Sequence, residues 1–390
     1  MSQQRIRAVY MRGGTSRCLV FHEEDLPRSR TARDRILSAA LGSPDPYGRQ
    51  LDGLGGGISS LSKACIIGPP SHPDADVDYT FAQVDVKSLL VDYAGNCGNC
   101  SSAVGPFAID EKLLVPSANP ALVRIHNTNT HKRILAHVPV EEGEAAVTGE
   151  FELPGVPGRG ARITLDFLEP GGAVTGRLLP TGRPRDVIGG LEASLVDATN
   201  PVVFVRARDL GLSGTETPSA IDADQALAAR LEAIRVEATA RMGVADSPAV
   251  PKIALVAPAA GFVTLNGRAW GAETVDLLAR VISMGNCHRA FALTSAMCLA
   301  VAARIEGTVV HECVRPHDRN AHGATSYPEQ ATHESSRAGG SHFNDIRLGH
   351  PSGVLPIDAS VVTQDGQPHA ECVRVYRTAR RLMEGFVRVP

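Results

Sequence analysis

The sequence predicts an α+β protein with two similar halves, each of which wraps strands around one buried helix. Short alternating or apolar runs typical of strands recur along the chain, whereas helical periodicity is rare. Two short predicted helices, one in each half, are apolar on every side. A helix with this pattern is expected to be buried on all sides. The 38 glycines and 26 prolines indicate many turns.

The elements follow in order along the chain. Amphipathic helices are expected at 31–41 and 222–242, and the two buried helices at 101–109 and 296–305. A Gly- and Pro-punctuated boundary at 182–194 divides the chain into residues 1–190 and 191–390, with a last strand that can return to the first half. Residues 311–346 are polar and are expected to form a long loop. Strands are expected at 6–10, 18–21, 64–67, 78–84, 122–125, 134–138, 161–167 and 202–205.

Composition excludes several classes of protein. A net charge of −3 over 390 residues, without a basic run, argues against nucleic acid and anionic membranes as partners. The polar start and the lack of a long apolar run predict a cytoplasmic chain that neither crosses a membrane nor is secreted. In that compartment the eight cysteines are expected to be free thiols.

Cys97 is the first candidate for chemistry. It lies in Gly-Asn-Cys-Gly-Asn, just before the buried helix at 101–109. Unpaired N–H groups and the dipole of a helix N-terminus favour an anion, so this thiol can lose its proton near neutral pH. The backbone amides of Gly98 and Asn99 could bind a carboxylate or an enolate oxygen.

Cys97 and Cys100 also form a C-x-x-C pair, which leaves other interpretations open. In a cytosolic chain this spacing can indicate a thiol–disulfide redox pair. It can be half of a zinc site, but no second C-x-x-C or H-x-H completes four ligands. Six histidines between His311 and His350 show no regular metal spacing, so no metal is expected.

Lys63 is the second candidate. It ends a Gly/Ser-rich turn and enters the apolar run at 64–67. Partial burial there would lower the pKa of the amine and make it usable as an acid or base. The hydroxyls of Ser60 and Ser62 in the same turn are weaker candidates for binding substrate. The glycine run is not a P-loop, because the lysine follows Gly57 by six residues.

Other polar segments could bind carboxylates. Arg12, Ser16 and Arg17 surround a Gly-Gly turn after the first strand. In the second half His288 precedes the start of the other buried helix, where Thr294 and Ser295 offer hydroxyls and amides. His350, before a late strand, is an outside candidate for the site.

These motifs resemble the PrpF family, from about residue 6 to the C-terminus and in the same order. The family includes 2-methylaconitate cis–trans isomerase, methylitaconate Δ-isomerase and 4-oxalomesaconate isomerase. The resemblance implies a diaminopimelate epimerase-like fold of two pseudo-symmetric halves, each a β-barrel around a central helix, with the site between them. The matching segments are 10–17, 42–48, 52–57 with Ser62-Lys63, 95–99, 127–130 and 349–353.

The resemblance also implies roles. In the family a lysine and the cysteine of Asn-Cys-Gly-Asn act as acid and base, which carries over to Lys63 and Cys97. The fold relative has a second cysteine at the other helix start, where this chain has Thr294-Ser295, so a two-cysteine racemase is disfavoured. The expected activity is a cofactor-independent isomerisation of a small unsaturated di- or tricarboxylate.

Two alternatives to an isomerase stay open at this point. One is a thiol–disulfide redox protein that uses Cys97 and Cys100, and the other is an accessory protein that binds carboxylates without catalysis. The expected partner is a small-molecule polycarboxylate substrate. The sequence is compatible with a homodimer or higher homo-oligomer and does not select the assembly. The sequence alone does not select one unsaturated acid.

Overall fold

The structure is a computed structural model that describes residues 3–245, 247–315 and 346–390. Most of the loop expected at 311–346 therefore lies outside the described residues. Its first residues, His311 to Cys313, end the short helix α6 (Val309–Cys313) instead of forming loop. Among the described residues no helix combines the length and the apolar character needed to cross a membrane.

The strands of the first half surround helix α2 (Gly98–Asp110), whose residues 98–109 are all buried. Neighbouring strands pair in the order β1, β2, β3, β4, β6, β7, β12, and the late strands β23 and β24 pair with β12 and β1 at either end. Only Thr378 separates β23 from β24, so the ring nearly closes. The bounds are β1 (Gln4–Gly13), β2 (Ser16–His22), β3 (Lys63–Gly68), β4 (Val77–Val84), β6 (Ala121–Asn127), β7 (Lys132–Val138), β12 (Ile163–Leu168), β23 (Gln367–Arg377) and β24 (Ala379–Val389).

The second half repeats this arrangement around helix α5 (Leu293–Ala303), which is buried along its whole length. Strands pair in the order β13, β14, β15, β16, β19, β21, β22, and β22 pairs with β23. The bounds are β13 (Asp186–Ile188), β14 (Leu191–Ala198), β15 (Asn200–Arg206), β16 (Lys252–Pro258), β19 (Leu277–Ser283), β21 (Ile346–His350) and β22 (Gly353–Gln364). The prediction of strands around two buried helices is confirmed.

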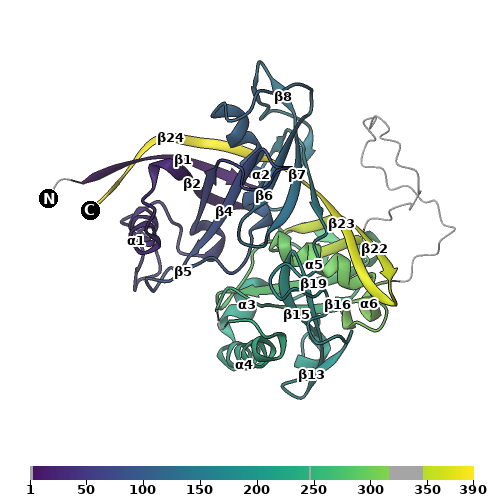
Figure 1. Ribbon diagram of the computed structural model, residues 1–390. Coiled ribbons are helices and arrows are strands. Elements are labelled where there is room, and N and C mark those ends of the chain that lie inside the picture. Colours follow the sequence, from purple (N-terminus) through teal and green to yellow (C-terminus); the bar gives the residue numbers. More distant parts are fainter. Residues whose placement is uncertain (1–2, 246, 316–345) are drawn as a thin grey trace.

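Figure 1 shows that the C-terminal end of the chain returns to the first half. The last strand, β24, runs antiparallel beside β1, from Gln4 opposite Val389 to Gly13 opposite Ala379, with one register shift between Tyr10 and Met11. The predicted boundary segment contains β13 and the turn between β13 and β14, whose residues Gly189 and Gly190 both have positive φ. The division at residue 190 stays a prediction.

The amphipathic segment expected at 222–242 is broken, contrary to expectation. Helix α3 (Pro218–Ala223) ends at Ala223, and Asp224 separates it from α4 (Gln225–Met242). The Asp224 carboxylate accepts a hydrogen bond from the N–H of Leu227 at 2.9 Å, so this residue starts a new helix. The apolar stripe of α4, which includes Leu231 and Ile234, packs in the core cluster of β15 and β16.

The remaining elements are short or peripheral. Helix α1 begins one residue before the predicted start, with Ser29 as its N-cap. The bounds are η1 (Glu23–Asp25), α1 (Arg30–Leu41), η2 (Ser59–Leu61), β5 (Val91–Asp92), β8 (Val140–Glu141), β9 (Glu144–Ala145), β10 (Phe151–Glu152), β11 (Arg159–Gly160), η3 (Ala207–Leu210), β17 (Phe262–Val263), β18 (Ala269–Trp270), η4 (Ala272–Thr274) and β20 (Asn286–Cys287).

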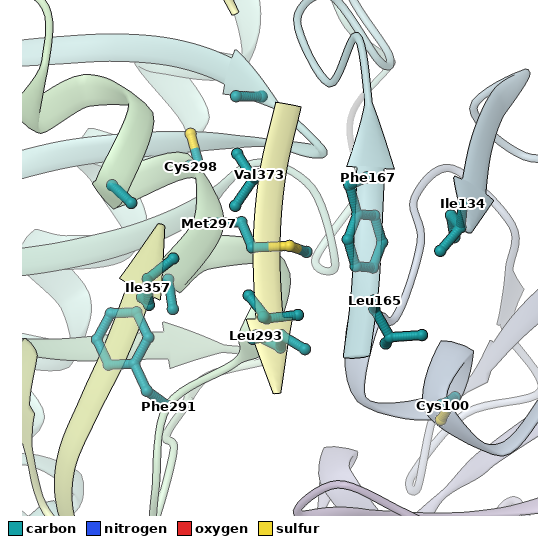
Figure 2. Close-up of a cluster of buried hydrophobic side chains, with 14 of the residues drawn as sticks. Cys100, Ile134, Leu165, Phe167, Phe291, Leu293, Met297, Cys298, Ile357 and Val373 are labelled. Carbon is teal, nitrogen blue, oxygen red and sulfur yellow. The ribbon is translucent and has the colours of Figure 1, made fainter. Parts of the chain in front are cut away.

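One apolar core joins the two halves. Cys100 and Leu165 from the first half belong to the same buried cluster as Leu293 and Met297 of α5 (Figure 2). The start of α2 meets the start of α5 closely: a Cβ atom on Gly98 would lie 3.0 Å from Met297 Cε and 3.2 Å from Leu293 Cγ. The two buried helices therefore present their N-terminal turns to a common region.

Candidate active site

A pocket lies where the two helix N-termini meet. It has about 510 Å³ of space not filled by protein atoms, part of it open to solvent. Both halves contribute to its wall, through the segment 95–99 on one side and 292–294 on the other. Of the residues predicted from the sequence, seven line it: Ser16, Lys63, Cys97, Gly98, Asn99, His288 and Thr294.

Cys97 is the N-cap residue of α2, as its place before a buried helix predicted. Its Sγ accepts a hydrogen bond from the backbone N–H of Cys100 at 3.5 Å. A hydrogen bond from the Cys100 thiol, opposed by burial and aided by the charge of Lys63, lowers the pKa of Cys97 below its usual range. The thiolate is therefore the favoured form of Cys97 at neutral pH.

Lys63 is the first residue of β3 and is 7% exposed. Its Nζ donates a short hydrogen bond to Oε1 of Gln83, the residue directly opposite on β4. The Gln83 amide in turn donates to the carbonyls of Ser59 and Ser62 at 3.1 and 2.9 Å. This chain of hydrogen bonds fixes the amine of Lys63 at the pocket wall.

The Asn99 side chain holds the turn between β1 and β2 against α2. Its Oδ1 accepts from Arg377 Nε at 3.1 Å and from the backbone N–H of Thr15 at 3.4 Å, and its Nδ2 donates to Thr15 Oγ1 at 3.2 Å. Gly14 is in the left-handed region (φ +52°), and a Cβ there would lie 2.2 Å from Asn99 Oδ1. The side-chain amide of Asn99 is thus occupied, while its backbone N–H belongs to the first turn of α2.

The structure does not bring five of the predicted binding residues to the pocket wall. The Arg12 guanidinium donates to the carbonyls of Gly14 and Thr378 at 3.0 and 2.8 Å. Arg17 lies over the ring of Tyr10. The remaining three do not line the pocket either: Ser60 within η2, Ser62 directly after η2, and Ser295 in α5.

Ser62 and Ser295 have local surroundings that differ from those expected. The hydroxyl of Ser62 accepts from Gln50 Nε2 at 2.7 Å, inside the protein. Ser295 is buried in the first turn of α5. This helix begins earlier than predicted, at Leu293, because Ala292 is its N-cap residue, and no side chain caps it.

His288 faces the pocket with a neutral ring. Burial, followed by the charges of Lys63 and Lys252, lowers the pKa of His288 to about 3. Its Nδ1 accepts from the N–H of Ala290 at 3.1 Å, which places the ring proton on Nε2. His350, the outside candidate, does not line the pocket, and its Nδ1 accepts from the N–H of Ser352.

Sequence reasoning missed Ser283 and two further polar residues of the second half that line the pocket, Asn200 and Lys252. These two begin the parallel neighbours β15 and β16, so strand pairing brings the same ends of both strands to one edge. The signal for Lys252 was present, because it precedes an apolar run just as Lys63 does. Gln83 and Asp92 of the first half were also missed.

Three further thiols lie together behind Cys97. The sulfur atoms of Cys18, Cys65 and Cys100 are all within 4.8 Å of one another and fully buried. The pKa of each is raised well above its usual value; burial is the largest cause for Cys65 and Cys100, and contributes for Cys18 beside opposing thiol hydrogen bonds. As neutral thiols among apolar strands they pack as small hydrophobic side chains.

The sequence matches known proteins over nearly its whole length. A family described as "PrpF protein" matches residues 3–326 and 321–390. The chain is 41% identical to the 3-methylitaconate isomerase of Eubacterium barkeri over 99% of its length and 98% of that protein. It is 39% identical to the 2-methyl-aconitate isomerase of Shewanella oneidensis (100% and 98%) and 37% identical to the 4-oxalomesaconate tautomerase of Pseudomonas putida (99% and 97%).

Solved structures agree with this match. A methylitaconate-delta-isomerase is similar with a TM-score of 0.74 and 40% identity, covering 100% of this chain and 96% of that one. A hydroxyproline epimerase from Agrobacterium vitis is similar in fold alone, with a TM-score of 0.53 at 11% identity over 98% and 92% of the two chains. The predicted epimerase-like fold is confirmed.

Proposed function

This chain belongs to the PrpF protein family, and from its pocket and its isomerase relatives we infer that it is an isomerase of small carboxylates. We propose that the substrate is an unsaturated acid with two or three carboxylates, and that the reaction moves a proton between carbons. The catalytic pair is Lys63 and Cys97. The observation that carries this proposal is a cysteine with a lowered pKa at a helix N-terminus, in one pocket with a buried lysine.

The protonation states suggest the direction of transfer. Cys97 as thiolate removes a proton from the carbon γ to one carboxyl group, and an S–H bond replaces the C–H bond. The electron pair spreads over a dienolate. The ammonium of Lys63 then gives a proton to the far carbon, which shifts the double bond. Rotation about the weakened bond, followed by return of the proton from the Cys97 thiol to the γ carbon, gives cis–trans isomerisation instead. After a double-bond shift, transfer of one proton from the Cys97 thiol to the Lys63 amine restores both groups.

The dienolate needs stabilisation where its charge collects, on the carboxylate oxygens. The first turn of a helix leaves N–H groups without an intrahelical partner, and its dipole favours negative charge. Gly98 and Asn99 belong to the first turn of α2, and Leu293 and Thr294 to that of α5, which has no side-chain cap. Amide donors at both walls of the pocket would therefore stabilise the intermediate.

Solvent exchange tests the proposal directly. The purified chain is incubated in D₂O with 2-methylaconitate, methylitaconate and oxalomesaconate in turn, and the products are followed by NMR. We expect one of these acids to be isomerised, with deuterium at the carbon that receives the proton. A chain that neither isomerises nor exchanges any of them, while binding them, is an accessory carboxylate-binding protein and not an isomerase.

A redox function is the second candidate, and one observation favours it. Cys97 caps α2 and Cys100 lies one turn into the helix, which is the spacing of a thiol–disulfide pair. Against it, the thiol of Cys100 is fully buried and its pKa is raised well above the usual value. The rival predicts reduction of a model disulfide by the chain, and the isomerase predicts none.

A further inference from the structure

We propose that Asn200 and Lys252 form a carboxylate subsite on the second-half wall of the pocket, and that this subsite makes a second carboxylate a requirement for binding. The inference deepens the proposed function and rests on it for the identity of the substrate class. It adds two binding residues from the second half that line the same pocket as Lys63 and Cys97.

The side chain of Asn200 is the first observation. It is 1% exposed, lines the pocket, and neither atom of its amide has a hydrogen-bond partner among the described residues. A buried amide without partners costs free energy, and such groups are nearly always satisfied in native proteins. A ligand in the pocket that accepts from Nδ2 supplies one of the two missing partners.

The surrounding backbone fixes Asn200 in this position. It follows Thr199, a β-branched residue in the left-handed region (φ 64°), at the tight turn between β14 and β15. The hydroxyl of Thr199 donates to the carbonyl of Thr294 in α5 at 2.9 Å. On its other side the amide of Asn200 abuts Gly95, where a Cβ would lie 2.5 Å from Oδ1. A strained turn held by its neighbours is typical of a functional position.

Lys252 is the second, independent observation. Its Nζ donates to the carbonyl of Ala249 at 3.2 Å, and no carboxylate of the described residues lies within ion-pair distance. Burial, followed by the charge of Lys63, lowers the pKa of Lys252 to about 8, so it is charged at neutral pH. The carboxylate of Asp92 lines the same pocket, and its charge raises the pKa of Lys252. Asp92 already accepts hydrogen bonds from the hydroxyl of Ser247 and from the N–H of Ala94.

The charges in the pocket favour a ligand with more than one negative group. Two buried ammonium groups, Lys63 and Lys252, repel each other, and the thiolate of Cys97 offsets one of them. A substrate carboxylate beside Lys252 removes the repulsion and satisfies its remaining donors. An acid with a single carboxylate, used at the helix N-termini, would leave Lys252 unpaired.

The affinities of succinate, which has two carboxylates, and of its monoamide succinamate, which has one, test this subsite without catalysis. Their dissociation constants are determined by calorimetry at pH 7 for the unaltered chain, for K252M and N200A, and for K87M as a control at an exposed lysine away from the pocket. The unaltered chain and K87M should prefer succinate by about ten- to a hundredfold. In K252M the preference should fall to about twofold or less, and in N200A succinate should bind about tenfold more weakly.

The outcomes separate this inference from the proposed function. A thermal melt first checks that each variant is folded, and N200A carries the test if K252M is not. An unaltered chain without a preference for succinate, or a folded K252M that keeps it, overturns the subsite even if the chain is an active isomerase. A preference that depends on Lys252 in a chain that isomerises none of the acids supports the subsite and overturns the proposed function.

Discussion

The Sγ atom of Cys97 accepts a hydrogen bond from the backbone N–H of Cys100 at 3.5 Å, and the nearby thiol of Cys100 is the largest cause of the lowered pKa of Cys97. The residue that makes this segment look like a redox motif therefore stabilises the thiolate of its neighbour. Cys100 is fully buried, with Cys18 and Cys65 beside it. Its contribution is electrostatic, and this gives the first prediction.

Replacement of Cys100 by alanine should change the pH dependence of the isomerase and not abolish its activity. Loss of the thiol donor raises the pKa of Cys97, so the acidic limb of the rate profile moves to higher pH, since the limb appears where the thiolate becomes protonated. Above that limb kcat should stay within about threefold of the unaltered chain. A pH series of initial rates measures both. Activity lost at every pH would instead favour the thiol–disulfide protein.

Cys97→Ser should lower kcat by at least about a hundredfold, because a serine hydroxyl is not ionised near neutral pH and cannot replace the thiolate as a base. The matched control is Cys372→Ser, a half-buried cysteine on β23 outside the pocket. Rates by NMR and a thermal melt of each variant separate lost chemistry from lost folding. Near-normal turnover in the folded Cys97→Ser chain would remove Cys97 from the mechanism.

Lys63→Ala should have a similar effect on kcat, about a hundredfold or more, because the proton that completes the double-bond shift has no donor. Gln83→Leu should be milder, since it frees the amine of Lys63 from its oriented hydrogen bond but leaves it in the pocket. Comparing kcat for the two variants therefore separates the loss of the proton donor from the loss of its orientation. Equal losses would indicate that Lys63 acts only through its contact with Gln83.

Lys252 should set a basic limb in kcat/KM. Its pKa is lowered to about 8, so the free chain loses this charge, and with it the affinity for the second carboxylate, as the pH rises through that value. Lys252→Arg keeps the charge at all accessible pH values and should move the limb upward. Values of kcat/KM from pH 6 to 10 for both chains test this. A limb that does not move in the arginine variant belongs to another group.

Local sequence patterns predicted the helices and strands, and they predicted the site residues that are marked by their neighbours in the sequence. Lys63 and Cys97 were found because a Gly-rich turn and a buried helix stand next to them in the sequence. Asn200 and Lys252 were missed because strand pairing, and not proximity in the chain, brings them together. The break at Asp224 was missed because a cap hydrogen bond outweighs apolar periodicity that continues across it.

The turn at Gly14 should be essential for stability because it packs on the side chain that holds it. Gly14→Ala adds a Cβ in the left-handed region (φ +52°), 2.2 Å from Asn99 Oδ1, and forces that amide away from Thr15 and Arg377. Gly143 also has positive φ (80°) but has nothing within 4 Å, so Gly143→Ala measures the backbone cost alone. Urea unfolding should show Gly14→Ala to be less stable than Gly143→Ala by about 1–3 kcal/mol, the usual cost of overpacking. Equal free energies of unfolding would mean that Asn99 moves without cost, and that its hydrogen bonds do not hold the turn against α2.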